Sequence, residues 1–104
     1  MKPLSFYCDC EQTQTLMGMY GDRLEKLSKS DLCDLISIFS AAINSDYTDP
    51  HRAGDLLSLA SVMSIETTDD LETALDVMDY FDRSDELDLL YGLAAMLGAR
   101  SEGQ

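Results

Sequence analysis

The fold is decided by residues 68–81, which read TDDLETALDVMDYF. On a helix, with about 100° between successive residues, the apolar and acidic side chains of this stretch fall on opposite sides. The apolar set is Leu71, Ala74, Leu75, Met78 and Phe81. The acidic set, at spacings of three, four and three, is Asp69, Glu72, Asp76 and Asp79. The pattern predicts an amphipathic helix with one buried and one solvated face, capped by Thr67 or Thr68.

The same period continues upstream of this stretch. It predicts a helix over about 11–27, which Gly21 weakens and offers a place to break. A second helix begins at Ser30, whose side chain is a good N-cap. A third begins with Asp49 as cap and Pro50 at its first position. This third helix is apolar nearly all round, so we expect it to be central.

Downstream, a fifth helix is expected from Ser84 to Leu97, with Gly98 at its C-terminal cap position. Residues 1–10 are apolar without helical period and predict an extended arm, and residues 99–104 predict a loose tail. At 104 residues the chain fits one domain, covering 1–104. The predicted fold class is all-α, a compact bundle of about five short helices with an extended N-terminal arm.

The charge is strongly acidic, with 20 Asp and Glu against 7 Lys and Arg and a net charge of −13. Ten of the acids lie in the stretch 66–88, where only Arg83 opposes them. Such a field repels DNA, RNA and anionic membranes and favours basic proteins. We therefore expect no direct nucleic-acid binding. No leader and no apolar run of membrane-spanning length is evident, so the expected location is cytoplasmic.

Residues with catalytic or metal-binding chemistry are few. Cys8, Cys10 and Cys33 are expected to be free thiols, because their spacing fits no zinc knuckle. His51 is the only histidine, and nothing in the sequence pairs it with a nucleophile. The acids after residue 78 lack the glycine and glutamate positions of a calcium loop. The sequence thus predicts no metal, no cofactor and no enzyme.

The acidic run is the remaining candidate site, for a protein partner. Its expected contact residues are Asp69, Glu72, Asp76, Asp79, Asp82, Asp85 and Glu86. The four acids of the amphipathic helix span about 15 Å, with a charge roughly every 5 Å, against one per 3.4 Å along a DNA strand. We expect a non-catalytic inhibitor or regulator that mimics nucleic-acid phosphates and blocks a basic nucleic-acid-binding protein. Counter-defence proteins of phages or mobile elements, such as anti-CRISPR or anti-restriction proteins, fit this profile.

Three alternatives stay open. The acidic face could serve only to keep the protein in solution, as many such faces do. The chain could be an antitoxin or immunity protein that neutralises a basic toxin, with Tyr91 or Tyr80 as an apolar anchor at the interface. It could also be a homodimeric interaction module without mimicry, because the helix expected over 84–97 is apolar around most of its circumference.

Overall fold

A computed structural model describes residues 2–44, 55–78 and 85–103. All regular structure in these residues is helical, which confirms the all-α fold class. These described ranges hold five α-helices and one short 3-10 helix: η1 (Leu4–Phe6), α1 (Glu11–Tyr20), α2 (Lys29–Asn44), α3 (Asp55–Val62), α4 (Asp69–Met78) and α5 (Glu86–Gly103).

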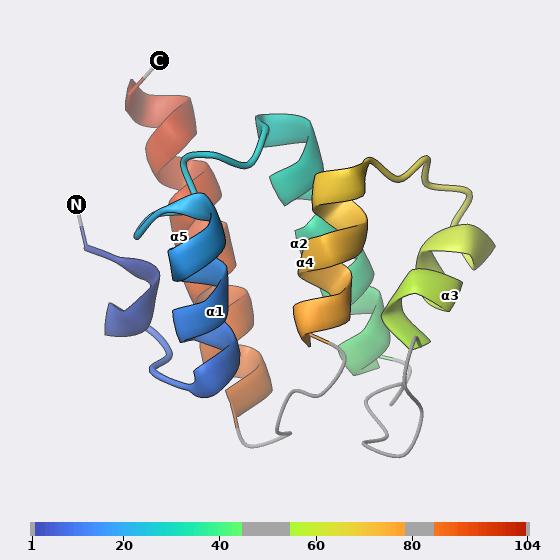
Figure 1. Cartoon of the computed structure of the whole chain (residues 1–104), viewed down its shortest axis with the longest axis horizontal. Coiled ribbons are helices and arrows are strands. Elements are labelled where there is room, and N and C mark those ends of the chain that lie inside the picture. The colour runs from blue at the N-terminus through green and yellow to red at the C-terminus, as the bar shows by residue number, and fades with distance from the viewer. Residues whose placement is uncertain (1, 45–54, 79–84, 104) are drawn as a thin grey trace.

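The helices form two layers. In Figure 1, α1 and α4 lie in front, α2 and α5 lie behind them, and α3 stands at one end. Helix α2 contacts α3, α4 and α5, so it is the central helix of the bundle. The expectation that the third helix is central is therefore wrong. Helix α3 has only eight residues and buries Leu56, Leu59 and Ala60, whereas Val62 stays 75% exposed.

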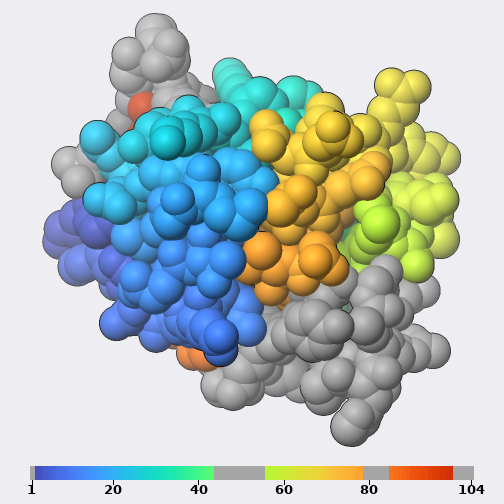
Figure 2. All heavy atoms as spheres, viewed as in Figure 1, coloured from blue at the N-terminus to red at the C-terminus, as the bar shows by residue number. Residues whose placement is uncertain are grey.

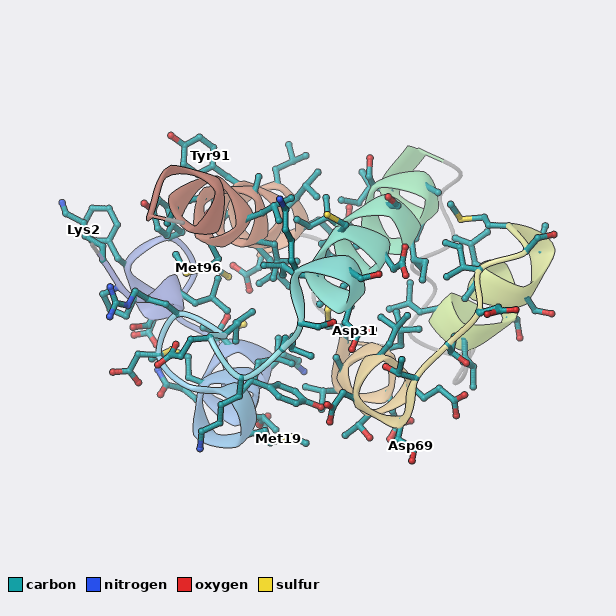
Figure 3. All side chains as sticks on the ribbon, turned by 90° about the horizontal axis from the view of Figure 1, so that it is seen from above. Lys2, Met19, Asp31, Asp69, Tyr91 and Met96 are labelled. Carbon is teal, nitrogen blue, oxygen red and sulfur yellow. The ribbon has the colours of Figure 1, made fainter. Side chains whose placement is uncertain are left out.

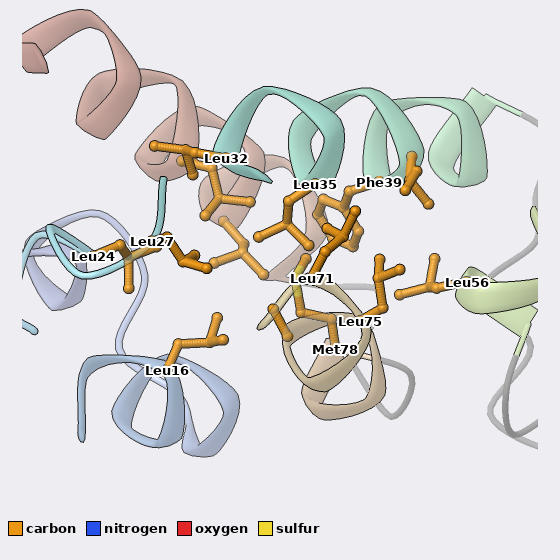
Figure 4. Close-up of a cluster of buried hydrophobic side chains, with 14 of the residues drawn as sticks. Leu16, Leu24, Leu27, Leu32, Leu35, Phe39, Leu56, Leu71, Leu75 and Met78 are labelled. Carbon is orange, nitrogen blue, oxygen red and sulfur yellow. The ribbon is translucent and has the colours of Figure 1, made fainter. Parts of the chain in front are cut away.

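The core lies between these two layers. Phe39 and Leu35 of α2 meet Leu71 and Leu75 of α4, and Leu16 approaches from α1 (Figure 4). All five side chains are fully buried. Burying such a side chain contributes about 1.5–3 kcal/mol relative to leaving it exposed, so this cluster is what fixes α4 on the bundle.

Two helix boundaries differ from the expected ones. Helix α1 ends at Tyr20, because Gly21 adopts a φ of 98° while its N–H still donates to the Met17 carbonyl at 2.9 Å. Such a φ is open to glycine and costly for other residues. Helix α2 is capped by Ser28 rather than Ser30, since the Ser28 Oγ accepts the Asp31 N–H at 3.0 Å.

The C-terminal end is also more helical than expected. Helix α5 runs through Gly98 and ends at Gly103, so Gly98 is not a C-terminal cap and residues 99–103 are not a loose tail. The expected helix starts at Asp49, Pro50 and Ser84 lie outside the described residues.

The N-terminal arm is not extended throughout, because it contains η1. Leu4 is fully buried, and its N–H donates to the Asp22 carbonyl at 2.9 Å. The arm packs against α5 at Gly92. A Cβ on Gly92 would lie 2.8 Å from Leu4 Cδ1 and 3.0 Å from Tyr7 Cβ. A glycine therefore lets the arm lie directly on the helix.

We predict that Gly92→Ala lowers the free energy of unfolding by about 1–3 kcal/mol, as overpacking does in a filled interior. Gly98→Ala is the matched control in the same helix, where a Cβ would have nothing within 4 Å. That variant should stabilise the protein by about 0.5–1 kcal/mol through helix propensity. Urea denaturation measures both. Equal effects of the two variants would mean that the arm does not depend on the close approach.

Candidate acidic protein-binding face

The acidic helix α4 begins with a side-chain cap. The Leu71 N–H donates to Thr68 Oγ1 at 3.1 Å, which makes Thr68 the N-cap. The first turn then carries Asp69, Asp70 and Glu72. Carboxylates are favoured there, because the unpaired N–H groups of a helix start carry a partial positive charge. The local sequence thus fixes where α4 begins and places three of its acids.

A buried carboxylate ties this start to the central helix. Asp31, in the first turn of α2, is 6% exposed. Its Oδ2 accepts a hydrogen bond from Thr68 Oγ1 at 2.9 Å, so the hydroxyl that caps α4 also satisfies Asp31. Ser28, Asp31 and Thr68 form one chain of hydrogen bonds that joins the N-termini of α2 and α4. Figure 3 shows Asp31 between the two helices.

A second link comes from α1. The Tyr20 hydroxyl donates to the Asp70 carbonyl at 3.1 Å. Burial raises the pKa of Tyr20, and the nearby Asp70 carboxylate raises it further, so the phenol keeps its proton at neutral pH. Helix α4 is therefore held near its first turn by hydrogen bonds to both α1 and α2.

The predicted division of α4 into two faces is present. Leu71, Ala74, Leu75 and Met78 are buried. On the other side Asp69, Glu72 and Asp76 are exposed, and these three residues are termed the acidic row. Glu72 accepts a hydrogen bond from Thr67 Oγ1. Within the described part of the chain, no basic side chain forms an ion pair with Asp69 or Asp76.

The acidic row borders helix α1. Helices α1 and α4 lie side by side on one face of the molecule (Figure 2). A shallow hollow between them is lined by Glu11, Gln12, Thr15, Asp76 and Val77. Glu11, which is exposed, thus adds a fourth carboxylate to the face of the acidic row. The sequence carries no signal for this neighbour, because only the packing of α1 on α4 brings residues 11 and 76 together.

The other predicted contact residues are not part of the row as the structure describes it. Asp79 and Asp82 lie outside the described residues. Asp85 precedes α5 and Glu86 begins it, and both are half-buried. Helix α5 packs against α2 and η1, so these two acids belong to a different element.

A second surface lies on the opposite side of the molecule and is apolar. The rings of Phe6, Tyr7 and Tyr91, together with Leu87 one turn before Tyr91 on α5, are termed the aromatic patch. The ring centroids of Phe6 and Tyr7 are 5.1 Å apart, and those of Tyr7 and Tyr91 are 5.5 Å apart. Tyr91 is 69% exposed, Leu87 68% and Phe6 58%. Figure 3 shows Tyr91 and Asp69 on opposite sides.

Neither surface shows the elements of a metal centre. Among the described residues, no three His, Cys, Asp or Glu side chains are grouped closely enough to hold a metal ion. The helices of that part of the chain are also too short or too polar to cross a membrane. Comparison with family models, curated proteins and solved structures finds no match to this chain. The function is therefore argued from geometry and charge.

Proposed function

We propose that the protein is a non-catalytic inhibitor or regulator that binds a basic nucleic-acid-binding protein through the acidic row and Glu11. The observation that carries this proposal is the acidic row itself. Three exposed carboxylates lie along one helix, and no described basic side chain pairs with Asp69 or Asp76. A lysine- or arginine-lined groove would supply the missing counter-charges.

The anchoring of α4 favours binding over simple solvation. The Asp31–Thr68 and Tyr20–Asp70 hydrogen bonds hold the first turn of the helix in place. Charges on a pre-formed helix lose little conformational freedom when a partner binds, which leaves more of the interaction energy as affinity. Asp69 and Asp76 are seven residues apart, or roughly 10 Å along the helix axis. The acidic row thus repeats charge at a scale similar to a phosphate strand.

The net charge of −13 favours the same partner class. Long-range attraction speeds the encounter with a positively charged protein and disfavours acidic ones. Nucleases and RNA-guided effectors of bacterial defence carry positively charged channels for nucleic acid. We therefore propose a counter-defence role, of the anti-CRISPR or anti-restriction kind, in which the acidic row occupies such a channel.

The test uses a charge-neutralised variant, Asp69→Asn with Glu72→Gln and Asp76→Asn. The partner is a nucleic-acid-binding protein captured from host lysate with the tagged wild-type protein. We predict that affinity for this captured protein falls by about 10- to 100-fold, since each lost rim contact costs about 0.5–1 kcal/mol. Asp22→Asn with Asp34→Asn and Asp88→Asn is the matched control. It removes the same total charge away from the acidic row and should weaken binding much less. Calorimetry on the purified pair gives both affinities.

If the two variants weakened binding equally, the loss would reflect net charge alone, and the proposal that the acidic row is the binding face would be wrong. If both variants kept full affinity, the charges of these carboxylates would not contribute to binding. In that case the second candidate function would gain support.

The second candidate is an antitoxin- or immunity-type protein that docks through the aromatic patch. It is favoured by the exposed Tyr91, which packs on Tyr7 and presents a rigid aromatic surface of the kind found at interface hot spots. In the same calorimetric assay, Tyr91→Ala separates the two proposals. A larger loss with Tyr91→Ala than with the charge-neutralised variant would assign binding to the patch. Light scattering on the free protein tests whether the patch instead pairs two copies of this chain.

A further inference from the structure

Two cysteines of the N-terminal arm lie in contact. The Sγ atoms of Cys8 and Cys10 are 3.8 Å apart, and the Cys8 thiol donates a weak hydrogen bond to Cys10. Both are free thiols in the structure. Cys8 is buried, whereas Cys10 is half-buried and so more accessible to a small reagent. The two sulfurs therefore differ in access while they lie next to one another.

Cys10 lies where a helix start meets a hydroxyl. It is the N-cap residue of α1, with extended backbone angles of −140° and 173°. Its Sγ is 3.2 Å from Oγ1 of Thr13, a buried residue three positions further on. Either the Cys10 thiol or the Thr13 hydroxyl can donate the hydrogen bond between them.

Cys8 has the opposite environment. The pKa of Cys8 is raised to about 12, chiefly by burial; a hydrogen bond with Thr13 lowers it and the neighbouring Cys10 raises it. Its sulfur also lies 4.0 Å from the Asp85 carbonyl oxygen, which is the alternative acceptor for the single thiol hydrogen. Cys8 therefore stays protonated at neutral pH and does not compete with Cys10 for an oxidant.

We propose that Cys8 and Cys10 are an oxidisable dithiol site, in which a peroxide oxidises Cys10 and Cys8 then closes an intramolecular disulfide. In the first step the Cys10 thiolate attacks one oxygen of hydrogen peroxide. An S–O bond forms and the O–O bond breaks, and the released hydroxide takes up the proton given by the Cys10 thiol. The products are Cys10 sulfenic acid and one water molecule.

In the second step the Cys8 thiol gives its proton to the sulfenic oxygen of Cys10 as the Cys8 sulfur attacks the Cys10 sulfur. The S–S bond forms, the S–O bond breaks, and the leaving hydroxide departs as water with the Cys8 proton. Two thiols and one peroxide thus give one disulfide and two waters. The sulfurs must approach from 3.8 Å to about 2.0 Å. The one intervening residue, Asp9, is exposed, and its carboxylate accepts a hydrogen bond from Gln14 Nε2 at 2.7 Å.

The experiment uses Cys33→Ser protein, so that Cys8 and Cys10 are the remaining thiols. The folded protein is treated with hydrogen peroxide and examined by intact mass and peptide mapping. The expected product is lighter by two hydrogen atoms, with the bond mapped to Cys8 and Cys10, and a reductant restores the starting mass. Products that carry only added oxygen, or no reaction short of unfolding, would overturn the proposal.

Two further variants in the same background test the order of events. With Cys8→Ala, Cys10 should stop at the sulfenic acid and react with dimedone. With Cys10→Ala, Cys8 should stay reduced over the same time. Oxidation of Cys8 in this variant as fast as oxidation of Cys10 in the other would contradict the assigned roles. Circular dichroism before treatment checks that each variant is folded. If the Cys8→Ala variant does not fold, the disulfide mapping in the Cys33→Ser protein decides the proposal.

Discussion

Leu71→Ala is expected to lower the free energy of unfolding by about 2–5 kcal/mol. Leu71 is fully buried and lies in the cluster between α4 and α2 (Figure 4). Truncation removes apolar contact and leaves a cavity that the surrounding helices fill only in part. Leu71 lies on the opposite side of α4 from the acidic row. Its packing against the core therefore orients the acidic row towards solvent. Urea denaturation followed by circular dichroism measures the change.

Leu87→Ala is the matched control for this prediction. It makes the same chemical change at a side chain that is 68% exposed, in the first turns of α5. We expect a change within about 0.5 kcal/mol, as for most surface substitutions. Similar losses for Leu71→Ala and Leu87→Ala would mean that α4 is not packed on the bundle as described.

Thr68→Ala is expected to cost about 2–4 kcal/mol, because one hydroxyl has two partners. Loss of the N-cap contact to the Leu71 N–H costs about 1 kcal/mol. Loss of the donor to Asp31 leaves a buried carboxylate oxygen without that partner, which costs a further 1–3 kcal/mol or so. Thr68→Ser keeps the hydroxyl and should restore most of the stability. Denaturation of the two variants beside the parent protein measures the loss of stability in Thr68→Ala and its recovery in Thr68→Ser.

The neighbouring threonine supplies the control. Thr67 donates to Glu72 in an exposed hydrogen bond, so Thr67→Ala should cost no more than about 0.5 kcal/mol. If Thr68→Ala costs no more than Thr67→Ala, the hydrogen-bond chain from Ser28 through Asp31 contributes nothing to the stability of the bundle.

The sequence alone predicts those features that depend on one helix only. The period of residues 68–81 separates Leu71 and Leu75 from Asp69 and Asp76, and the structure has the same division. Local rules also allow Thr68 as the cap. Such features depend on side chains within one or two turns of each other, so the order of residues alone contains them.

Features that depend on packing were not predictable. The pairing of Thr68 with Asp31 joins residues 37 positions apart, and Glu11 meets the hollow beside Asp76 only because α1 packs on α4. Capping rules also placed the end of the last helix at Gly98, yet α5 continues to Gly103. Propensity gives glycine only a small penalty inside a helix, and context overrides it.

We propose that the acidic row takes the place of nucleic acid on a basic protein. The most direct measurement is competition: a fixed amount of the captured nucleic-acid-binding protein, this chain, and increasing duplex DNA, at low and at high salt. We expect mutually exclusive binding, and an affinity that falls as salt rises and falls further in the charge-neutralised variant. A stable ternary complex with DNA, or an affinity unaffected by salt, would contradict it.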